Sequence, residues 1–365
     1  MKNILYLNPS ADIGGAERSL YQMLILLDKK EYQPLVILPQ GPLVKDLQDA
    51  GIKFHIINRK IIEAHSIFGL LFASLYLAKL VKKYNVTIIH ANSKYCCRIA
   101  LWASFLTGSK LFLHWRDLNI WPDEKRYINW FRRRVNIITV SRAVKNYLCD
   151  KNIKARNIDV LYDPIDPKYE KTYSPNKYRS QFSIDKEFVL AITGRIDSWK
   201  GHIVLVKALA LSGITNLKLL IAGTYHLVNN PSFKVQLEQC IKDNNLTRNI
   251  QFIGSRDDME KVLSVVDVVI VPSDHEPLGM VVLEAMASGK PVIGSDTGGI
   301  RETIIDGITG LLFEPGNIQN LAEKIKLLYT DSSLARKLGE AGRKRYLENF
   351  NEDIFVKVLN NIYKS

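Results

Sequence analysis

The chain has 365 residues, of which 47% are hydrophobic and 24% are charged, the usual balance of a soluble globular protein. This composition excludes a disordered or low-complexity chain, and the length allows two domains with separate cores. The formal net charge is +13, and most of the excess lies in residues 1–170, where 26 Lys and Arg face 15 Asp and Glu.

Short apolar runs alternate with helical patterns along most of the chain, which is typical of α/β units with parallel sheets. The strands fall into two groups separated by an irregular stretch, residues 163–183, where we expect two domains to join. We predict an N-terminal domain at 1–165 and a C-terminal domain at 170–349. The predicted strands are 3–8, 34–38, 53–57, 86–90, 110–114, 136–140 and 157–161, then 187–193, 217–222, 250–253, 267–271, 291–295 and 310–313.

Two adjacent glycines follow the first predicted strand. Gly14 and Gly15 lie ahead of an amphipathic helix that we predict from Ser19 to Leu27. Bare backbone lets a phosphate or a sugar approach closely, although a strand-to-helix turn also favours glycine for conformational reasons alone. The spacing does not supply the G-x-G-x-x-G of dinucleotide-binding folds.

Two segments of the first half mix apolar and basic residues. Residues 67–77 are almost uncharged and precede three lysines at 79–83. The run is too short to span a bilayer, which takes about 20 apolar residues, and it fits a buried helix with a solvated basic end. Aromatic and basic residues interleave between 115 and 134. That mixture suits an anionic membrane interface, and it equally suits core tryptophans beside a solvated basic face.

A basic turn follows the first strand of the second group. Arg195 comes directly after Gly194, and Lys200 and Gly201 precede a helix predicted at 202–211. In open α/β sheets, ligands bind at the carboxyl ends of strands. Two cations there can neutralise a diphosphate, the Arg as a fork and the Lys as a point charge. A solvated basic turn is the ordinary alternative for either residue alone.

Two glutamates flank the start of a later helix. The strand predicted at 267–271 ends in a proline, and residues 278–287 fit a helix closed by Gly and Pro. Glu276 then lies on the preceding loop and Glu284 about two turns into the helix. Carboxylates are strong acceptors for hydroxyl donors, so the pair suits a sugar and a ribose. An exposed loop acid and a helix-surface acid are the alternative, because acids are common near helix starts.

The same helix start suits an anion. The amides of Leu278, Gly279 and Met280 would lack intrahelical partners, and a helix N-terminus attracts a pyrophosphate. The amides and the two glutamates together therefore point to a nucleotide sugar.

The motifs resemble those of the family-four glycosyltransferases, which retain anomeric configuration and have the GT-B fold, an α/β architecture of two Rossmann-like domains facing across a cleft. The resemblance spans nearly the whole chain and is strongest between residues 188 and 316. The similar motifs are GGAE at 14–17, G-R-x-x-x-x-K-G at 194–201, E-x-x-x-x-x-x-x-E at 276–284, and shorter matches at 140–144, 297–302 and 306–312.

The resemblance implies roles in the second domain. Arg195 and Lys200 would hold the diphosphate, Glu284 the ribose, and Glu276 the donor sugar near its reacting carbon. Leu278 stands where the family often has Phe, which would change packing against the sugar but not the hydrogen bonds.

It also implies roles in the first domain. Gly15, beside Gly14, would face the diphosphate across the interdomain cleft. His114 resembles the histidine that touches the donor sugar, and without the resemblance it would pass for a structural residue at the end of a strand. The last helix, within 350–365, would pack back on the first domain. Residues 163–166 read Asp-Pro-Ile-Asp where the family often has Asn-Gly-Ile-Asp, so the hinge is expected to differ.

The function implied is transfer of a hexose-type sugar from a nucleoside-diphosphate-sugar donor to an acceptor hydroxyl, with retention. The acceptor is expected to be a saccharide or a lipid-linked molecule in surface polysaccharide or glycolipid assembly. No D-x-D carboxylate motif occurs, so we expect no metal and no other cofactor. A sugar-nucleotide epimerase or a phosphorolytic enzyme of the same fold is the main alternative. A nucleic-acid-binding protein is a distant one, because no nucleic-acid module accompanies the positive charge.

Cysteine usage and the N-terminus bear on location. The four cysteines form no C-x-x-C pair, which fits a reducing compartment. The apolar run at the N-terminus is too short for a signal peptide. We therefore expect a cytoplasmic protein, with peripheral contact at the inner face of the cytoplasmic membrane through the basic first domain.

Overall fold

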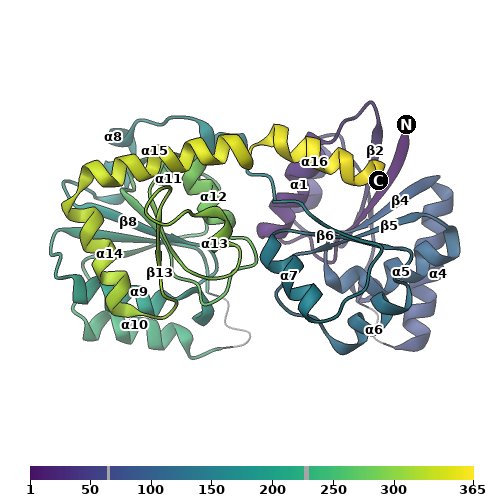
Figure 1. The fold of residues 1–365 in the computed structure, drawn as a ribbon, viewed down its shortest axis with the longest axis horizontal. Helices are drawn as coiled ribbons and strands as arrows, with labels where there is room; N and C mark the ends of the chain where they lie inside the picture. The colour runs from purple at the N-terminus through teal and green to yellow at the C-terminus, as the bar shows by residue number, and fades with distance from the viewer. Residues whose placement is uncertain (64–65, 226–229) are drawn as a thin grey trace. The chain divides into compact units, whose positions relative to one another are not determined.

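The computed structural model describes residues 1–63, 66–225 and 230–365, which form two compact units (Figure 1). Unit 1 is Met1–Pro164 with Glu352–Ser365, and unit 2 is Ile165–Asn351. The C-terminal unit begins a few residues before the predicted 170, because the linker after Pro164 packs within it. Tyr169 is buried there, and its carbonyl accepts a hydrogen bond of 3.0 Å from the Ser288 hydroxyl.

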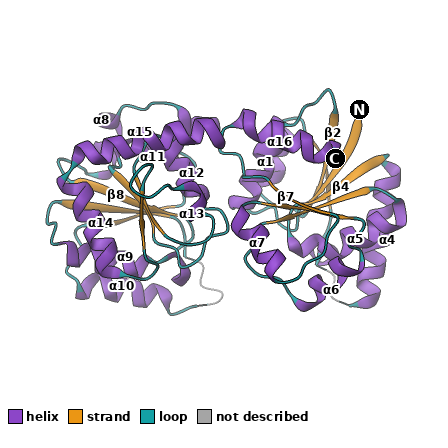
Figure 2. Cartoon of the chain, viewed as in Figure 1, coloured by secondary structure: helices purple, strands orange, loops and turns teal. Residues whose placement is uncertain are grey.

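Unit 1 contains a seven-stranded parallel sheet in the order β3-β2-β1-β4-β5-β6-β7, with helices on both of its faces (Figure 2). Its strands are β1 (Lys2–Leu7), β2 (Tyr32–Leu38), β3 (Lys53–Ile56), β4 (Val86–Ala91), β5 (Lys110–Trp115), β6 (Val135–Thr139) and β7 (Asn157–Val160). Its helices are α1 (Gly15–Leu26), α2 (Leu43–Asp49), α3 (Arg59–Ile62), α4 (Ile67–Lys83), α5 (Cys97–Thr107), α6 (Pro122–Trp130), α7 (Arg142–Asp150) and α16 (Glu352–Lys364).

Unit 2 contains a six-stranded parallel sheet in the order β10-β9-β8-β11-β12-β13. Its strands are β8 (Phe188–Thr193), β9 (Leu217–Ala222), β10 (Ile250–Gly254), β11 (Val268–Val271), β12 (Val292–Ser295) and β13 (Leu311–Phe313). Its helices are α8 (Pro175–Arg179), α9 (His202–Ser212), α10 (Phe233–Asp243), α11 (Met259–Val265), α12 (Met280–Ala287), α13 (Ile300–Thr303), α14 (Ile318–Thr330) and α15 (Ser332–Asn349).

The predicted α/β class with two parallel sheets is confirmed. Every predicted strand is present, with ends that differ by at most two residues. Both faces of a parallel sheet are covered by helices, so its strands are continuous apolar runs, and these are easy to find in a sequence. In β1 and β11, for example, Leu5 and Val269 each have no exposed surface.

Each sheet has one point where the strand order reverses. In unit 1 the chain turns from the β1 side to the β4 side, and in unit 2 from the β8 side to the β11 side. A crevice opens outside the carboxyl ends of the strands at such a point, and ligands of open α/β sheets bind there. In unit 2, the loops after β8 and β11 carry the predicted cations and Glu276 respectively.

Two helix starts differ from prediction. Helix α1 begins at Gly15 rather than Ser19, because Ala16, Glu17 and Arg18 are good helix formers and Glu17 lies in the first turn, where the helix dipole favours an acid. Helix α12 begins at Met280 rather than Leu278, because Gly279 is left-handed (φ 86°) and cannot be part of the helix. Glu284 is therefore about one turn into α12, not two.

Helix α16 belongs to the core of unit 1. Its buried residues Phe355, Leu359, Ile362 and Tyr363 join the cluster that includes Ile4 of β1. The apolar residues recur every three or four positions, so one stripe of the helix faces the sheet.

The aromatic and basic segment between 115 and 134 divides between core and surface. Trp115 has no exposed surface, whereas Trp130 is 69% exposed. The guanidinium of Arg134 lies over the ring of Phe105, 5.3 Å from its centroid. Neither sequence interpretation therefore describes the whole segment.

Candidate active site

The candidate site lies at the carboxyl edge of the unit 2 sheet, in the loop between β8 and α9. Asp197 is buried, and its carboxylate accepts hydrogen bonds from the Ser198 amide (2.7 Å) and from the indole N–H of Trp199 (3.1 Å). Residues Ser198–Lys200 form a 3-10 turn that this carboxylate caps. The turn presents Lys200 next to the Trp199 ring, with Nζ 4.2 Å from the ring centroid. Lys200 is thus held in place before any ligand arrives.

Two glycines allow the backbones around this loop to approach closely. A Cβ on Gly201 would lie 1.9 Å from the carbonyl oxygen of Pro272, and one on Gly223 would lie 1.8 Å from that of Gly194. Both glycines have positive φ, 76° and 147°. Other residues would therefore clash with backbone and strain it as well.

The loop after β11 meets the loop after β8. The amide of Asp274 donates to the Trp199 carbonyl at 2.8 Å, and the His275 ring stacks on the Trp199 ring with centroids 5.0 Å apart. These contacts bring Glu276 to Lys200, 76 residues away in sequence. Lys200 Nζ lies 2.6 Å from Glu276 Oε2, and the two side chains are 15% and 13% exposed. The predicted catalytic residues are Glu276, His114, Arg195 and Lys200, and the structure brings Lys200 and Glu276 into contact.

A third loop, after β12, fixes the backbone of Glu276. The Gly299 amide donates to the Glu276 carbonyl at 2.8 Å. A Cβ on Gly298 would lie 2.1 Å from the same oxygen, so only glycine fits. The Ser295 hydroxyl donates to the Ser273 carbonyl at 2.5 Å and ties the base of the loop down. Glu276 thus has a fixed main chain and a side chain with acceptor capacity to spare.

The start of α12 lies directly after Glu276. The amides of Met280 and Val281 have no carbonyl one turn earlier in the helix and can donate to an anion, whereas the Val282 amide donates to the Gly279 carbonyl at 2.9 Å. Leu278 is buried and Gly279 is left-handed, so of the predicted trio only Met280 is part of the helix, and anion binding by the three amides stays a prediction. Glu284 is half-buried on the same helix.

Arg195 occupies the exposed start of the β8–α9 loop. Its guanidinium lies 5.8 Å from the centroid of the Trp199 ring. It makes no salt bridge with any residue that the structure describes. A cation with a planar fork of donors and no carboxylate partner suits a diphosphate.

In unit 1, Gly14 and Gly15 lie at the exposed start of α1, after β1. Burial raises the pKa of nearby Glu17, and an Asn8 amide hydrogen bond of 3.3 Å partly offsets this. Both glycines are exposed, and the Glu17 carboxylate lies beside Gly14, whose backbone hydrogen bond also lowers the pKa of that acid.

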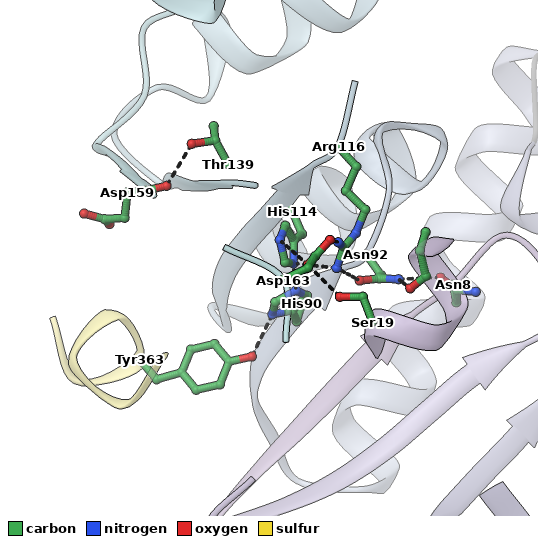
Figure 3. A network of polar contacts seen from close by, with 11 residues as sticks. Asn8, Ser19, His90, Asn92, His114, Arg116, Thr139, Asp159, Asp163 and Tyr363 are labelled. Atoms are coloured by element: carbon green, nitrogen blue, oxygen red, sulfur yellow. Dashed lines mark hydrogen bonds and ion pairs between the residues drawn. The ribbon is translucent and has the colours of Figure 1, made fainter. Parts of the chain in front are cut away.

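His114 lies near the end of β5 and has no exposed surface. Figure 3 shows it in a polar network with His90, Arg116 and Asp163. Burial, then the charge of Arg116, then His90 hold its pKa well below the ordinary value, so the ring is neutral. Arg116 can only donate, and its Nη2 is 3.2 Å from His114 Nδ1, so Nδ1 accepts and the proton is on Nε2. That Nε2 has no hydrogen-bond partner among the described residues, and Asp163 Oδ1 is 3.9 Å away.

The neutral tautomer of His114 sets a directed chain of hydrogen bonds. His90 Nε2 lies 3.2 Å from His114 Nδ1 and must donate to it. The other nitrogen, Nδ1, then accepts from the hydroxyl of Tyr363 at 2.7 Å, and Tyr363 accepts from Tyr6 at 3.0 Å. This chain fastens α16 to the sheet of unit 1 (Figure 3).

Asp163, near the end of the first segment of unit 1 (Met1–Pro164), joins the same network. It accepts from Ser19 at 2.5 Å and pairs with Arg116, which also donates to the Asn92 carboxamide oxygen at 3.1 Å. The residue that replaces the family's usual Asn at this hinge is therefore a buried carboxylate with several partners. The substitution of Asp for Asn at position 163 was evident from the sequence. Its partner Arg116 was not predicted, because Arg116 lies in none of the recognised motifs.

Sequence reasoning also missed Asp197, Trp199 and His275. Both Asp197 and Trp199 lie inside the unspecified x-x-x-x of G-R-x-x-x-x-K-G, and the stack on His275 depends on tertiary contact. An aromatic residue directly before Lys200 was the one available signal.

Comparison with known proteins gives two family matches. The chain matches the model of Glycosyl transferases group 1 over residues 175–345 and that of Glycosyltransferase Family 4 over residues 13–169. These ranges include the predicted motifs of unit 2 and of unit 1 respectively.

Matches to individual proteins are consistent with the two family matches. The chain is 26% identical to an N-acetyl-alpha-D-glucosaminyl L-malate synthase of Bacillus anthracis over 298 residues, 79% of this chain and 77% of that protein. It is 28% identical to a capsular polysaccharide biosynthesis glycosyltransferase of Staphylococcus aureus, over 63% of this chain and 61% of that one. The fold is that of Anabaena HepE solved with UDP and glucose, with a TM-score of 0.89, 24% identity and full coverage of both chains. The chain belongs to the group 1, family-four glycosyltransferases of the GT-B fold.

Proposed function

We propose that the protein transfers a sugar from a nucleoside-diphosphate-sugar donor to an acceptor hydroxyl with retention of configuration. The observation that carries the proposal is the Lys200–Glu276 pair at the reversal point of the unit 2 sheet. A cation for the leaving group and a carboxylate for the sugar lie 2.6 Å apart on loops held by hydrogen bonds.

The chemistry follows from where charge develops. When the anomeric C–O bond breaks, its electron pair goes to the diphosphate, and the anomeric carbon gains positive character. Arg195, Lys200 and the first amides of α12 would stabilise the departing diphosphate, and Glu276 would stabilise the sugar. The acceptor hydroxyl forms the new bond to the anomeric carbon, and its proton passes to an oxygen of the departing diphosphate. Glu284 would hold the ribose hydroxyls.

Lys200 then has two tasks. In the donor-free protein it neutralises Glu276, and with donor bound it also faces the diphosphate. An ammonium has three donors, so it can keep the carboxylate and add a phosphate oxygen. Replacing Glu276 by a neutral isostere would therefore leave the diphosphate contact intact.

The unit 1 residues are proposed contacts of the same donor. Gly14 and Gly15 are exposed at the start of α1, and a diphosphate would compete with the Glu17 carboxylate for the Gly14 backbone. His114 offers an Nε2 proton without a partner among the described residues, but Asp163 and Arg116 would have to shift before a ligand reached it.

For the donor, UDP-sugars are the first candidates, because HepE of Anabaena was solved with UDP. The S. aureus relative in capsular polysaccharide biosynthesis supports a saccharide or lipid-linked acceptor in surface polysaccharide or glycolipid assembly. A cytoplasmic location, at the inner face of the membrane, completes this proposal.

The test is a panel of UDP-, GDP- and ADP-sugars read by thermal stabilisation, since a ligand that binds the folded state raises the melting temperature. One donor series should stabilise the wild type and fail to stabilise Arg195→Ala/Lys200→Ala. Stabilisation by none, or equal stabilisation of the double variant, would refute the donor site. Product analysis separates the rivals: an epimerase converts the donor sugar without an acceptor, and a phosphorolytic enzyme needs inorganic phosphate.

Turnover without a metal is a further part of the proposal. Protein cations and the α12 amides would neutralise the leaving group in place of a divalent ion. Activity should therefore persist in excess EDTA. Complete loss that added Mg²⁺ or Mn²⁺ reverses would contradict it.

A further inference from the structure

Helix α4 of unit 1 exposes a continuous row of large apolar side chains. Ile67, Phe68, Leu71, Phe72 and Leu75 are each between 52% and 84% exposed. We call these five side chains the α4 surface. Single exposed apolar residues are normal, but a contiguous set marks an interaction site. The opposite side of α4 needs no partner, because Leu70, Leu77 and Val81 are buried in unit 1.

Basic residues continue the same side of the helix. Lys79, Lys82 and Lys83 are exposed in its last two turns. At 3.6 residues per turn, they and the α4 surface fall within about 160° of the helix circumference. The exposed side is therefore apolar over its first turns and positively charged over its last, with no acidic residue between 66 and 83.

This differs from the sequence expectation of a buried helix with a solvated basic end. The apolar run is wider than one stripe, because residues 67, 68, 71 and 72 add a second apolar side to the one that faces the sheet. A helix that only covers a sheet would be polar there.

We propose that the α4 surface binds the interface of an anionic lipid bilayer, with α4 lying in the plane of the membrane. The five apolar side chains would enter the boundary between headgroups and acyl chains, and the three lysines would meet the lipid phosphates. None of the helices that the structure describes is long and apolar enough to cross a bilayer, so the contact is peripheral. Charge favours an anionic bilayer over a second copy of this chain as the binding partner. A second copy of the same surface would bring three more lysines and no carboxylate.

The inference specifies the membrane contact of the proposed function, but its test does not depend on catalysis. The experiment measures sedimentation of the full chain with vesicles of phosphatidylcholine alone or with about one third phosphatidylglycerol. Wild type should bind the anionic vesicles more tightly, and binding should weaken as salt rises.

Apolar and basic parts can be removed separately. The variant Phe68→Ser/Phe72→Ser should bind the anionic vesicles at least about tenfold more weakly, because two aromatic side chains no longer enter the lipid. Its matched control is Leu211→Ser/Val235→Ser, which removes two exposed apolar side chains from unit 2 and should bind as wild type does.

The variant Lys79→Gln/Lys82→Gln/Lys83→Gln should bind phosphatidylglycerol vesicles about tenfold or more weakly and lose most of the salt dependence. Its control is Lys326→Gln/Lys337→Gln/Lys344→Gln.

Equal vesicle binding by wild type and both α4 variants would overturn the proposal. So would a concentration-dependent dimer of the wild type that the Phe68→Ser/Phe72→Ser variant abolishes, since the occupant would then be a second copy. Donor binding in the absence of vesicles should be unchanged in these variants, because α4 lies outside the donor loops. Vesicle binding without donor binding would instead refute the proposed enzyme function and leave this inference standing.

Discussion

Each unit contains a largely buried cation–carboxylate pair near the point where its strand order reverses, and the two pairs differ in how many hydrogen-bond partners they have. In unit 1, Asp163 accepts from Ser19 and Arg116, and Arg116 also donates to Asn92 and His114. In unit 2, the side chains of Lys200 and Glu276 form a hydrogen bond with each other, and with no other side chain among the residues that the structure describes. A carboxylate has about four acceptor sites and an ammonium three donors, so the unit 2 pair keeps capacity for a ligand. Unused hydrogen-bonding capacity, rather than charge, separates a binding pair from a structural one.

The largest effect on stability is expected in unit 1. Asp163→Ala should lower the free energy of unfolding by about 3–5 kcal/mol, because it leaves the Arg116 charge buried without a carboxylate. Chemical denaturation measures the loss. Asp159→Ala, at a nearby acid of β7, serves as a control with a small effect. A loss below about 1 kcal/mol for Asp163→Ala would mean that the network is not structural.

In unit 2, the expected effect is on the rate. Glu276→Gln should lower sugar transfer by about 10²–10³-fold, the cost of removing one preorganised electrostatic group, and should change stability by less than about 1 kcal/mol. Steady-state kinetics and denaturation on the same preparation separate the two quantities, with Glu238→Gln on α10 as the control. The comparison between the units fails if Glu276→Gln unfolds the protein as Asp163→Ala does.

A smaller effect is expected from pH, and it concerns both units. Burial lowers the pKa of His90 to about 3 and that of His202 to about 4, from an ordinary value of about 6.5. Below pH 6.5 the unfolded chain therefore binds more protons than the folded chain, and stability falls as pH falls. Each imidazole should contribute about 1 kcal/mol of this loss from about pH 7 to about pH 5.5.

The variant His90→Gln should remove the contribution of that histidine to the loss of stability at low pH. Thermal melts across this range measure it, with His275→Gln at an exposed position as the control. A wild-type stability that stays flat between those pH values would contradict the burial of these histidines.

The smallest effect is expected at an exposed ion pair. Arg301 lies 2.6 Å from Asp296, but the side chains are 64% and 41% exposed. Arg301→Gln should change the free energy of unfolding by no more than about 1 kcal/mol. A larger loss of unfolding free energy, measured by denaturation, would show that good geometry stabilises an ion pair even when it is exposed.

Sequence patterns predicted the two sheets well, because strands buried on both faces are continuous apolar runs. Helix starts were less accurate, since the left-handed Gly279 delays α12 and the strong helix formers after Gly15 advance α1. Among the predicted site residues, the motifs included Lys200 and Glu276, which the structure pairs. Trp199 and Arg116 were not, because their importance arises from contacts made only in the folded chain.

Titration of UDP into matched variants tests the central claim most directly, namely that Lys200 serves the diphosphate and Glu276 the sugar. Calorimetry should show UDP binding that Lys200→Ala weakens by about tenfold or more, the range for a charge-assisted contact. Glu276→Gln should bind UDP as tightly as wild type or more tightly, because its Lys200 is freed for phosphate. If Lys200→Ala binds UDP like wild type, or Glu276→Gln loses UDP binding, the assignment of the two residues is wrong.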